Sequence, residues 1–122
     1  MSGVIEILSC GPAMTVQDRG RTGFLARGMT RGGAADDLAL YEGAALLGQS
    51  PDLAALEMVG MGGSFRVTTD TRIALTGAPM TALLDDAPLA WNASHLLPAG
   101  ATLNIGGARK GTYGYLHLGG GI

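Results

Sequence analysis

The sequence has one cysteine, few aromatic residues and no excess of basic charge. The single cysteine, Cys10, excludes an intrachain disulfide and a cysteine cluster for zinc, and it favours a reducing compartment, so we expect a cytoplasmic protein. Aromatic residues make up 5% of the chain and the net charge is −2, which argues against nucleic acid as a partner. No apolar stretch approaches the roughly 20 residues of a membrane helix, and no signal peptide is evident, so we expect no membrane association.

Glycine, by contrast, is abundant, with 21 residues that stand singly or in pairs between short apolar runs. This pattern is typical of turns and bulges in a β-rich chain. The expected strands start about 8–12 residues apart, a spacing that favours a sandwich or a barrel. They are Val4–Ser9, Ala13–Val16, Ala54–Val59, Ser64–Thr68, Arg72–Thr76, Thr81–Leu84, Leu96–Leu97, Thr102–Ile105 and Thr112–Leu118. The 122 residues suffice for one domain, and no linker or internal repeat divides them.

One segment, Ala34–Leu47, has the pattern of a helix. Gly48 stands where a glycine commonly ends a helix, and Pro51 prevents continuation. Gly43 within the segment costs about 1 kcal/mol relative to alanine, which indicates either close packing against a sheet or a weaker helix. The apolar stripe consists of Leu38, Tyr41 and Ala45, with Leu40, Ala44 and Leu47 close by.

The stretch Thr15–Asp37 combines several glycines with half of the chain's eight Lys and Arg residues. These are Arg19, Arg21, Arg27 and Arg31. Glycine lets backbone N–H groups approach a ligand closely, and the start of the following helix adds partial positive charge. The stretch is therefore suited to hold an anion. A structural alternative stays open, in which the arginines are solvated or paired with Asp18, Asp36 and Asp37.

Familiar catalytic and metal-binding patterns are missing from the sequence. It has no P-loop, no G-x-S-x-G and no H-E-x-x-H, and its two histidines are far apart. We therefore predict no metal site and interpret His117 as an ordinary strand residue. Asp85 and Asp86 are expected to form a hairpin turn, after which Pro88 and Leu89 indicate an edge strand. The residues alone thus predict a mainly β protein with one helix (α+β) and a candidate anion-binding loop.

Several segments of the chain together resemble a known family. They are GPAMTVQDRGRTGF from Gly11, RGMTRGGAADDLAL from Arg27, Ala55–Glu57, Leu75–Ala78, Trp91 and Tyr115–Ile122. The residues of these segments and their order along the chain resemble those of the allophanate hydrolase subunit 2 family, also called the biotin-dependent carboxyltransferase family. Two departures stand out. Thr30 and Gly32 occupy the places of the family's usual proline and serine, so Gly32 cannot replace a ligand contact from that hydroxyl. Family members also continue into a second half that residues 1–122 lack.

The resemblance implies that residues 1–122 are the N-terminal subdomain of a protein with a cyclophilin-like β-barrel architecture. It also implies one of three functions. The first is a subunit of an ATP-dependent amide hydrolase, foremost of the 5-oxoprolinase type, which opens a cyclic amide. The second is the carboxyltransferase domain of a urea amidolyase, which moves a carboxyl group from carboxybiotin to urea. The third is a non-catalytic partner that antagonises an inhibitor of a histidine kinase.

Both enzymatic functions develop negative charge on an oxygen atom, and fixed N–H and guanidinium donors must meet that charge. The resemblance therefore directs attention to the glycine- and arginine-rich stretch. The expected site residues are Gln17, Asp18, Arg21, Arg31, Gly32, Gly33 and Asp36. Of these, the two arginines would bind the anion, the glutamine would orient an amide or ureido group, and an aspartate would hold an arginine in place.

The resemblance also implies what the chain would assemble with. We expect no cofactor on this chain alone, whereas ATP or carboxybiotin would act in the full complex. The implied partners are an allophanate hydrolase subunit 1-like protein and further subunits, without which the chain would be an inactive component. An incomplete barrel would leave open strand edges, which tend to pair, so we also expect self-association.

Overall fold

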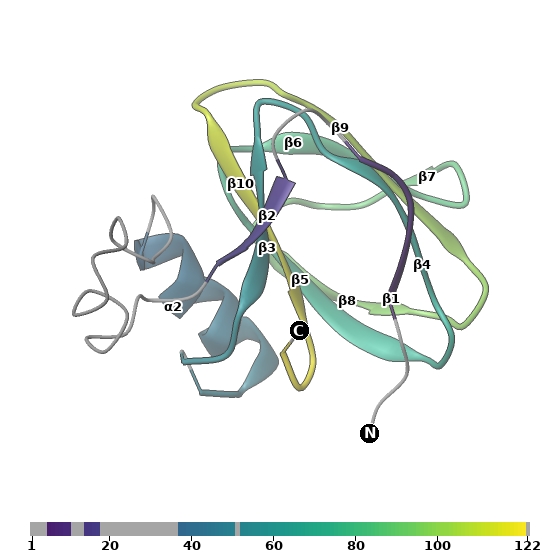
Figure 1. The fold of residues 1–122 in the computed structure, drawn as a ribbon, viewed down its shortest axis with the longest axis horizontal. Coiled ribbons are helices and arrows are strands. Elements are labelled where there is room, and N and C mark those ends of the chain that lie inside the picture. Colours follow the sequence, from purple (N-terminus) through teal and green to yellow (C-terminus); the bar gives the residue numbers. More distant parts are fainter. Residues whose placement is uncertain (1–4, 11–13, 18–36, 51, 122) are drawn as a thin grey trace.

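The computed structural model describes residues 5–10, 14–17, 37–50 and 52–121. Within these ranges the protein is mainly β with one α-helix, as predicted (Figure 1). The strands are β1 (Ile5–Cys10), β2 (Met14–Gln17), β3 (Ala55–Val59), β4 (Gly63–Val67), β5 (Thr71–Gly77), β6 (Met80–Leu84), β7 (Ala87–Pro88), β8 (Ala93–Leu97), β9 (Thr102–Ala108) and β10 (Tyr113–Leu118). The helix is α2 (Asp37–Leu47), and no helix among the described residues is long and apolar enough to cross a membrane.

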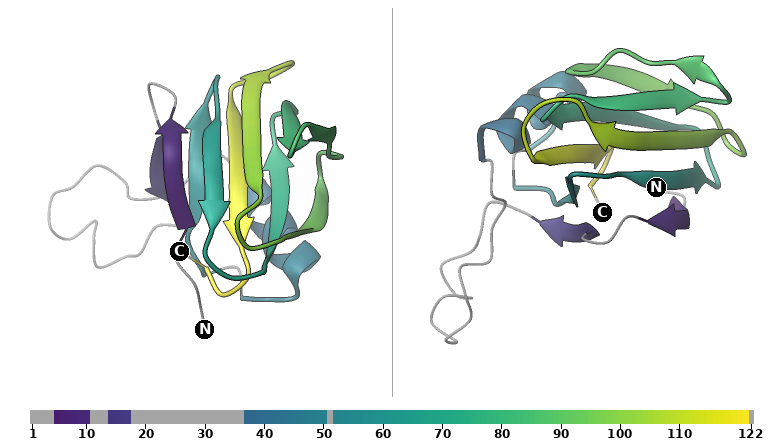
Figure 2. Two further views of the ribbon diagram at one scale, coloured as in Figure 1. Left: turned by 90° about the vertical axis from the view of Figure 1, so that its right-hand side faces the viewer. Right: turned by 90° about the horizontal axis from the view of Figure 1, so that it is seen from above.

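The strands form two antiparallel sheets that face each other, as the two views in Figure 2 show. One sheet has the order β1-β4-β9-β6-β7, and the other has the order β2-β3-β10-β5-β8. Within the described ranges no strand pairing joins the two sheets, so they form a sandwich and not a closed barrel. Strands β1 and β2 are consequently edge strands of their sheets, as are β7 and β8.

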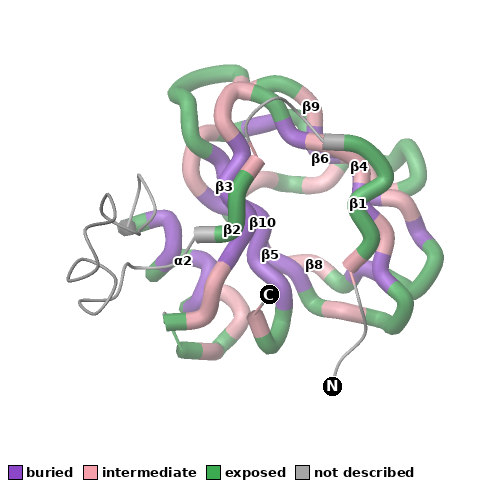
Figure 3. The backbone as a smooth tube through the Cα atoms, viewed as in Figure 1, coloured by how far each residue is buried: buried purple, intermediate pink, exposed green. Residues whose placement is uncertain are grey.

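The main hydrophobic core lies between the two sheets. Phe65 of β4 and Leu103 of β9 project into it from one sheet, and Leu75 of β5 and Leu116 of β10 project from the other. All four side chains are fully buried, and Figure 3 shows how burial concentrates along these central strands. Because side chains alternate along a strand, every second residue of β3, β5 and β10 points away from this core and towards the helix.

Helix α2 packs on the outer face of β5 and β10. Its buried residues are Ala39, Leu40, Gly43 and Ala44. The stripe predicted around Leu38, Tyr41 and Ala45 is wrong, because these residues are exposed, Leu38 to 67% and Tyr41 to 44%. The small residues on the buried side let the helix backbone come close to the sheet, which the larger side chains would prevent.

Backbone geometry confirms several predictions about turns and ends. Gly48 has a φ of 66° directly after the helix, which is the conformation of a helix-terminating glycine. Asp85 and Asp86, with φ values of 47° and 71°, form the turn between β6 and β7 and match a type I′ hairpin. Pro88 closes β7, which pairs only with β6, so the predicted edge strand is also confirmed.

Candidate functional site

A layer of buried polar side chains lies between helix α2 and the sheet beneath it. It comprises Glu57 of β3, Thr76 of β5, and Tyr115 and His117 of β10, none more than 6% exposed. The strand register creates this layer, because Tyr115 pairs with Glu57 on one side and with Thr76 on the other. Directly paired residues point to the same face of a sheet, so these three side chains form a row across three adjacent strands.

Glu57 brings a carboxylate into this buried layer. The hydroxyl of Tyr115 donates a hydrogen bond of 2.5 Å to Oε2 of Glu57. A buried carboxylate is costly unless donors surround it, and a buried hydroxyl likewise requires a partner. The bond therefore serves both groups, and it fixes the carboxylate on the helix-facing side of the sheet.

The threonine and the histidine of the layer connect the sheet to the helix. Thr76 Oγ1 donates to the carbonyl oxygen of Ala39 at 2.9 Å, so towards His117 it can only accept. Nε2 of His117 lies 2.8 Å from Oγ1 and is therefore the protonated ring nitrogen. Burial lowers the pKa of His117 from 6.5 to about 4, so the imidazole is neutral at pH 7.

Gly43 allows the helix to approach this histidine. A Cβ atom at position 43 would lie 2.2 Å from both Cε1 and Nε2 of the His117 ring. Non-bonded carbon atoms keep about 3.5–4.0 Å apart, so no larger residue fits here without movement. Of the two interpretations of Gly43, close packing against the sheet is confirmed, and His117 is indeed a strand residue.

Most of the residues predicted to bind an anion fall outside the described residues. Those within 18–36 are Asp18, Arg21, Arg31, Gly32, Gly33 and Asp36. Their convergence on an anion therefore stays a prediction. Gln17 is the last residue of β2, and its backbone pairs with Ala55 of β3, while its side chain is also outside the description. The described elements on either side of 18–36 both adjoin the polar layer, because Thr15 of β2 pairs with Glu57 and Ala39 of α2 accepts from Thr76.

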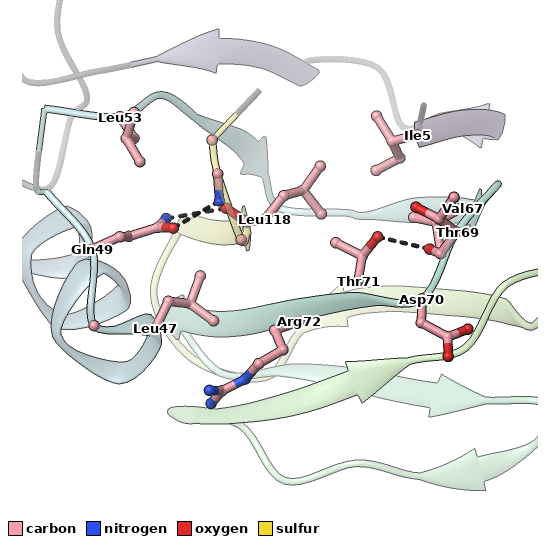
Figure 4. A pocket seen from close by; sticks show the side chains of 14 residues that line it. Ile5, Leu47, Gln49, Leu53, Val67, Thr69, Asp70, Thr71, Arg72 and Leu118 are labelled. Carbon is pink, nitrogen blue, oxygen red and sulfur yellow. Dashed lines mark hydrogen bonds between the residues drawn. The ribbon is translucent and has the colours of Figure 1, made fainter. Parts of the chain in front are cut away.

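A second feature is an open cavity of about 880 Å³ beside the end of α2 (Figure 4). Its charged lining residues are Arg72 and Asp70, and its apolar lining includes Ile5 and Leu118. Gln49 also lines it, but its amide is occupied, since Nε2 donates to the carbonyl oxygen of Leu118 and Oε1 accepts from the backbone of Gly120. Among the described residues no group of three or more His, Cys, Asp or Glu side chains is suited to a metal ion.

Residues 27–122 match the family model for the carboxyltransferase domain, subdomain A and B. The match covers more than half of the chain, and the chain therefore belongs to this family.

Individual relatives and a solved structure show which proteins this chain is similar to. The chain is 36% identical over 119 residues to a 5-oxoprolinase subunit of Haemophilus influenzae, an alignment that covers 98% of this chain and 38% of that protein. It is 32% identical over 102 residues to a putative urea carboxylase of Emericella nidulans, covering 84% of this chain and 8% of that protein. The crystal structure of the Kluyveromyces lactis urea carboxylase superposes with a TM-score of 0.90 at 31% identity, over 97% of this chain and 10% of that one. The chain thus spans little more than a third of the length of the 5-oxoprolinase relative.

Sequence reasoning missed the polar layer as a unit. Its one local signal was a single acid, Glu57, within the otherwise apolar strand Ala55–Val59. The partners of Glu57 come from strands far along the chain, with Tyr115 58 residues away. Only the pairing of β3 with β10 and of β10 with β5 brings these residues together.

Proposed function

We propose that this chain is the N-terminal part of a subunit of an ATP-dependent amide hydrolase of the 5-oxoprolinase type. The observation that carries the proposal is the 36% identity to the 5-oxoprolinase subunit of Haemophilus influenzae, which extends over 98% of this chain. Because the chain spans only 38% of that relative, residues outside it are needed to complete an active site. The 122-residue chain by itself is therefore an inactive component.

The role proposed for this chain is to hold an anionic group. Opening a cyclic amide places negative charge on the former carbonyl oxygen, and fixed donors stabilise that charge. Arg21 and Arg31 are the proposed donors, with Gln17 orienting the amide. The elements that flank 18–36 in sequence are held to the sheet, by the pairing of β2 with β3 and by the hydrogen bond from Thr76 to Ala39. Rigid attachment of this kind is what preorganised donors require.

Carboxyl transfer is the second candidate function. It is favoured by the family match and by the TM-score of 0.90 to the K. lactis urea carboxylase. In this alternative the same donors receive the carboxyl group of carboxybiotin and the oxygen of urea. The two candidates share the need for an oxyanion site and differ in biotin, which only the second requires in the complex.

Partner proteins follow from the same proposal. The Haemophilus influenzae relative is one subunit of its enzyme, which indicates an assembly of several chains. The proposed partners are an allophanate hydrolase subunit 1-like protein and further subunits that contribute ATP binding. A non-catalytic role, as a protein partner that regulates a kinase inhibitor, would be indicated by stable binding to such a partner without turnover of either substrate.

The test is ATP hydrolysis that depends on 5-oxoproline, measured on the assembled complex with the full-length protein that includes this chain. Arg21→Met and Arg31→Met should each lower the rate by roughly 10²–10³, the effect of removing one oxyanion donor. Arg109→Met is the matched control, because Arg109 is an exposed residue directly after the end of β9 and its replacement should leave the rate unchanged. Wild-type rates in Arg21→Met and Arg31→Met, as in the control, would argue against the proposed donors. A wild-type complex whose ATP hydrolysis does not depend on 5-oxoproline would argue against the function itself.

A further inference from the structure

Thr76 of β5 holds the start of helix α2 to the sheet. Its Oγ1 donates to the carbonyl oxygen of Ala39, the third residue of α2, at 2.9 Å. Both residues are buried, with exposed fractions of 0% and 1%. A hydrogen bond that water cannot reach is not readily exchanged for one to solvent, so this contact fixes the first turn of the helix relative to β5.

His117 of the neighbouring strand β10 sets the direction of the Thr76 hydroxyl. A hydroxyl carries one proton, so Thr76 can donate to only one acceptor at a time. Nε2 of His117 lies 2.8 Å from Oγ1 and donates to it, which leaves the hydroxyl proton for Ala39. The three groups therefore form a directed chain of hydrogen bonds that runs from β10 through β5 to α2.

The same first turn follows the stretch that supplies the proposed anion donors. Residues 18–36 lie outside the described part of the chain, and α2 begins directly after them at Asp37. Strand β2 directly precedes them and is paired with β3. Tyr115 connects the two sides, because it donates to Glu57 of β3 and belongs to the same buried cluster as Leu40 of α2. The polar layer thus determines how β2 and the start of α2 lie relative to each other.

We propose that Thr76 is a positioning residue for the anion site, and that His117 orients it. This inference rests on the proposed function. Donors stabilise a developing charge only when they are held in place before the reaction, and a displacement of about 1 Å can cost roughly 10²-fold in rate. Thr76 acts through the backbone of α2 and not on the substrate itself.

A purely structural role for Thr76 can be separated from positioning, because the far end of α2 has hydrogen bonds of its own. Gln49 Nε2 donates to the carbonyl oxygen of Leu118 at 3.1 Å, and Gln49 Oε1 accepts from the backbone N–H of Gly120 at 2.9 Å. Ala39 and Leu47 lie about 12 Å apart along the helix, at a rise of about 1.5 Å per residue. Each end of α2 can therefore be released without the other.

The first test compares Thr76→Val, Thr76→Ser and Gln49→Met in the full-length protein within its assembled complex. Thr76→Val keeps the branched shape of the side chain and removes its hydroxyl, whereas Thr76→Ser keeps the hydroxyl. Gln49→Met is the matched control, because it removes the hydrogen bonds at the far end of α2. The measurement is kcat and KM of ATP hydrolysis that depends on 5-oxoproline, well below the unfolding temperature of every variant.

The expected result is a loss of kcat at one end of the helix only. Thr76→Val should lower kcat by roughly 10–100-fold and leave KM for 5-oxoproline within about twofold, because displaced donors weaken transition-state stabilisation more than substrate binding. Thr76→Ser should keep kcat within about threefold of the wild type, since the hydroxyl remains. Gln49→Met should have the wild-type kcat even where its unfolding temperature falls as far as that of Thr76→Val.

Hydrogen exchange of the α2 amides gives a second test that does not depend on turnover. Release of Ala39 from the sheet should let the first half of the helix open more often. Thr76→Val should therefore speed exchange at residues 40–44 by roughly tenfold or more, whereas Gln49→Met should speed exchange in the last turn only. Wild-type exchange at residues 40–44 in Thr76→Val would overturn the proposal, because the hydroxyl would then not hold the first turn.

The outcomes also separate this proposal from the proposed function. In a complex that is active as the wild type, a wild-type kcat in Thr76→Val would overturn the positioning role and leave the function intact. An equal loss of kcat in Gln49→Met would overturn it too, because general loosening of α2 would then explain the effect. A wild-type complex without 5-oxoproline-dependent ATP hydrolysis would overturn both, since Thr76 would then have no such site to position.

Discussion

Replacing Gly43 with alanine should destabilise the protein, although alanine is the better helix former. The new Cβ atom would lie 2.2 Å from two atoms of the His117 ring and 2.3 Å from a third. His117 is only 3% exposed, and its Nε2 is held by Thr76, so the ring cannot move aside into solvent without loss. Either the ring must turn away from Thr76 or the helix must shift away from the sheet.

The expected magnitude follows from three opposing contributions. Helix propensity favours alanine over glycine by about 1 kcal/mol. Overpacking at a buried position typically costs about 1–3 kcal/mol. Giving up the hydrogen bond between His117 and Thr76 adds about 1 kcal/mol. The steric contact therefore outweighs the propensity, and we expect Gly43→Ala to lower the free energy of unfolding by about 1–3 kcal/mol.

Urea unfolding, followed by far-UV circular dichroism, measures this difference. Ala45→Gly on the exposed side of α2 is the matched control and should cost about 1 kcal/mol from propensity alone. His117→Ala removes the obstructing ring, so the losses in the double variant Gly43→Ala/His117→Ala should fall short of additivity by about 0.5–3 kcal/mol. A Gly43→Ala protein as stable as the wild type, or more stable, would refute the close approach of helix and ring.

Two further predictions concern the same polar layer. The pKa of His117 is about 4 in the folded protein and 6.5 when unfolded, so the unfolded chain binds a proton that the folded one does not. The free energy of unfolding should therefore fall as the pH drops from about 6.5 to about 4, by up to about 3 kcal/mol. In urea unfolding, His117→Asn should lack this part of the pH dependence. The same pH dependence in the wild type and in His117→Asn would contradict the burial argument. Tyr115→Phe should cost about 1.5–3 kcal/mol because buried Glu57 loses a donor, whereas Tyr113→Phe should change the unfolding free energy by less than about 0.5 kcal/mol. Similar losses in the two tyrosine variants would show that the bond to Glu57 contributes no stability.

Local patterns sufficed to predict most of the secondary structure. Turns at Asp85 and Asp86 and the helix end at Gly48 depend on backbone conformations that few residue types favour, so sequence reveals them. The packing face of α2 was predicted wrongly, because large apolar residues such as Leu38 and Tyr41 were expected to face the sheet. Close approach to the sheet instead selects small residues such as Gly43 and Ala44, whose apolar signal is weak.

Local sequence patterns could not predict the sites that depend on the order of strands in the sheets. Glu57 and Thr76 lie in one row only because β10 separates their strands in the sheet, an order that does not follow the sequence. The edges of the two sheets likewise depend on β1 and β2 joining different sheets, although these strands are consecutive in the chain. The anion-binding residues predicted between Gln17 and Asp37 were inferred from composition and family resemblance, and they remain predictions.

The most direct measurement for the proposed function is the ratio of two rates in one preparation of the assembled complex with the full-length protein. These are the rates of ADP formation dependent on 5-oxoproline and on urea, measured with equal enzyme and saturating ATP. The 5-oxoprolinase assignment predicts turnover with 5-oxoproline and none above background with urea. Turnover with urea alone, and only in the presence of a biotin-carrying partner, would contradict it and establish the carboxyltransferase alternative.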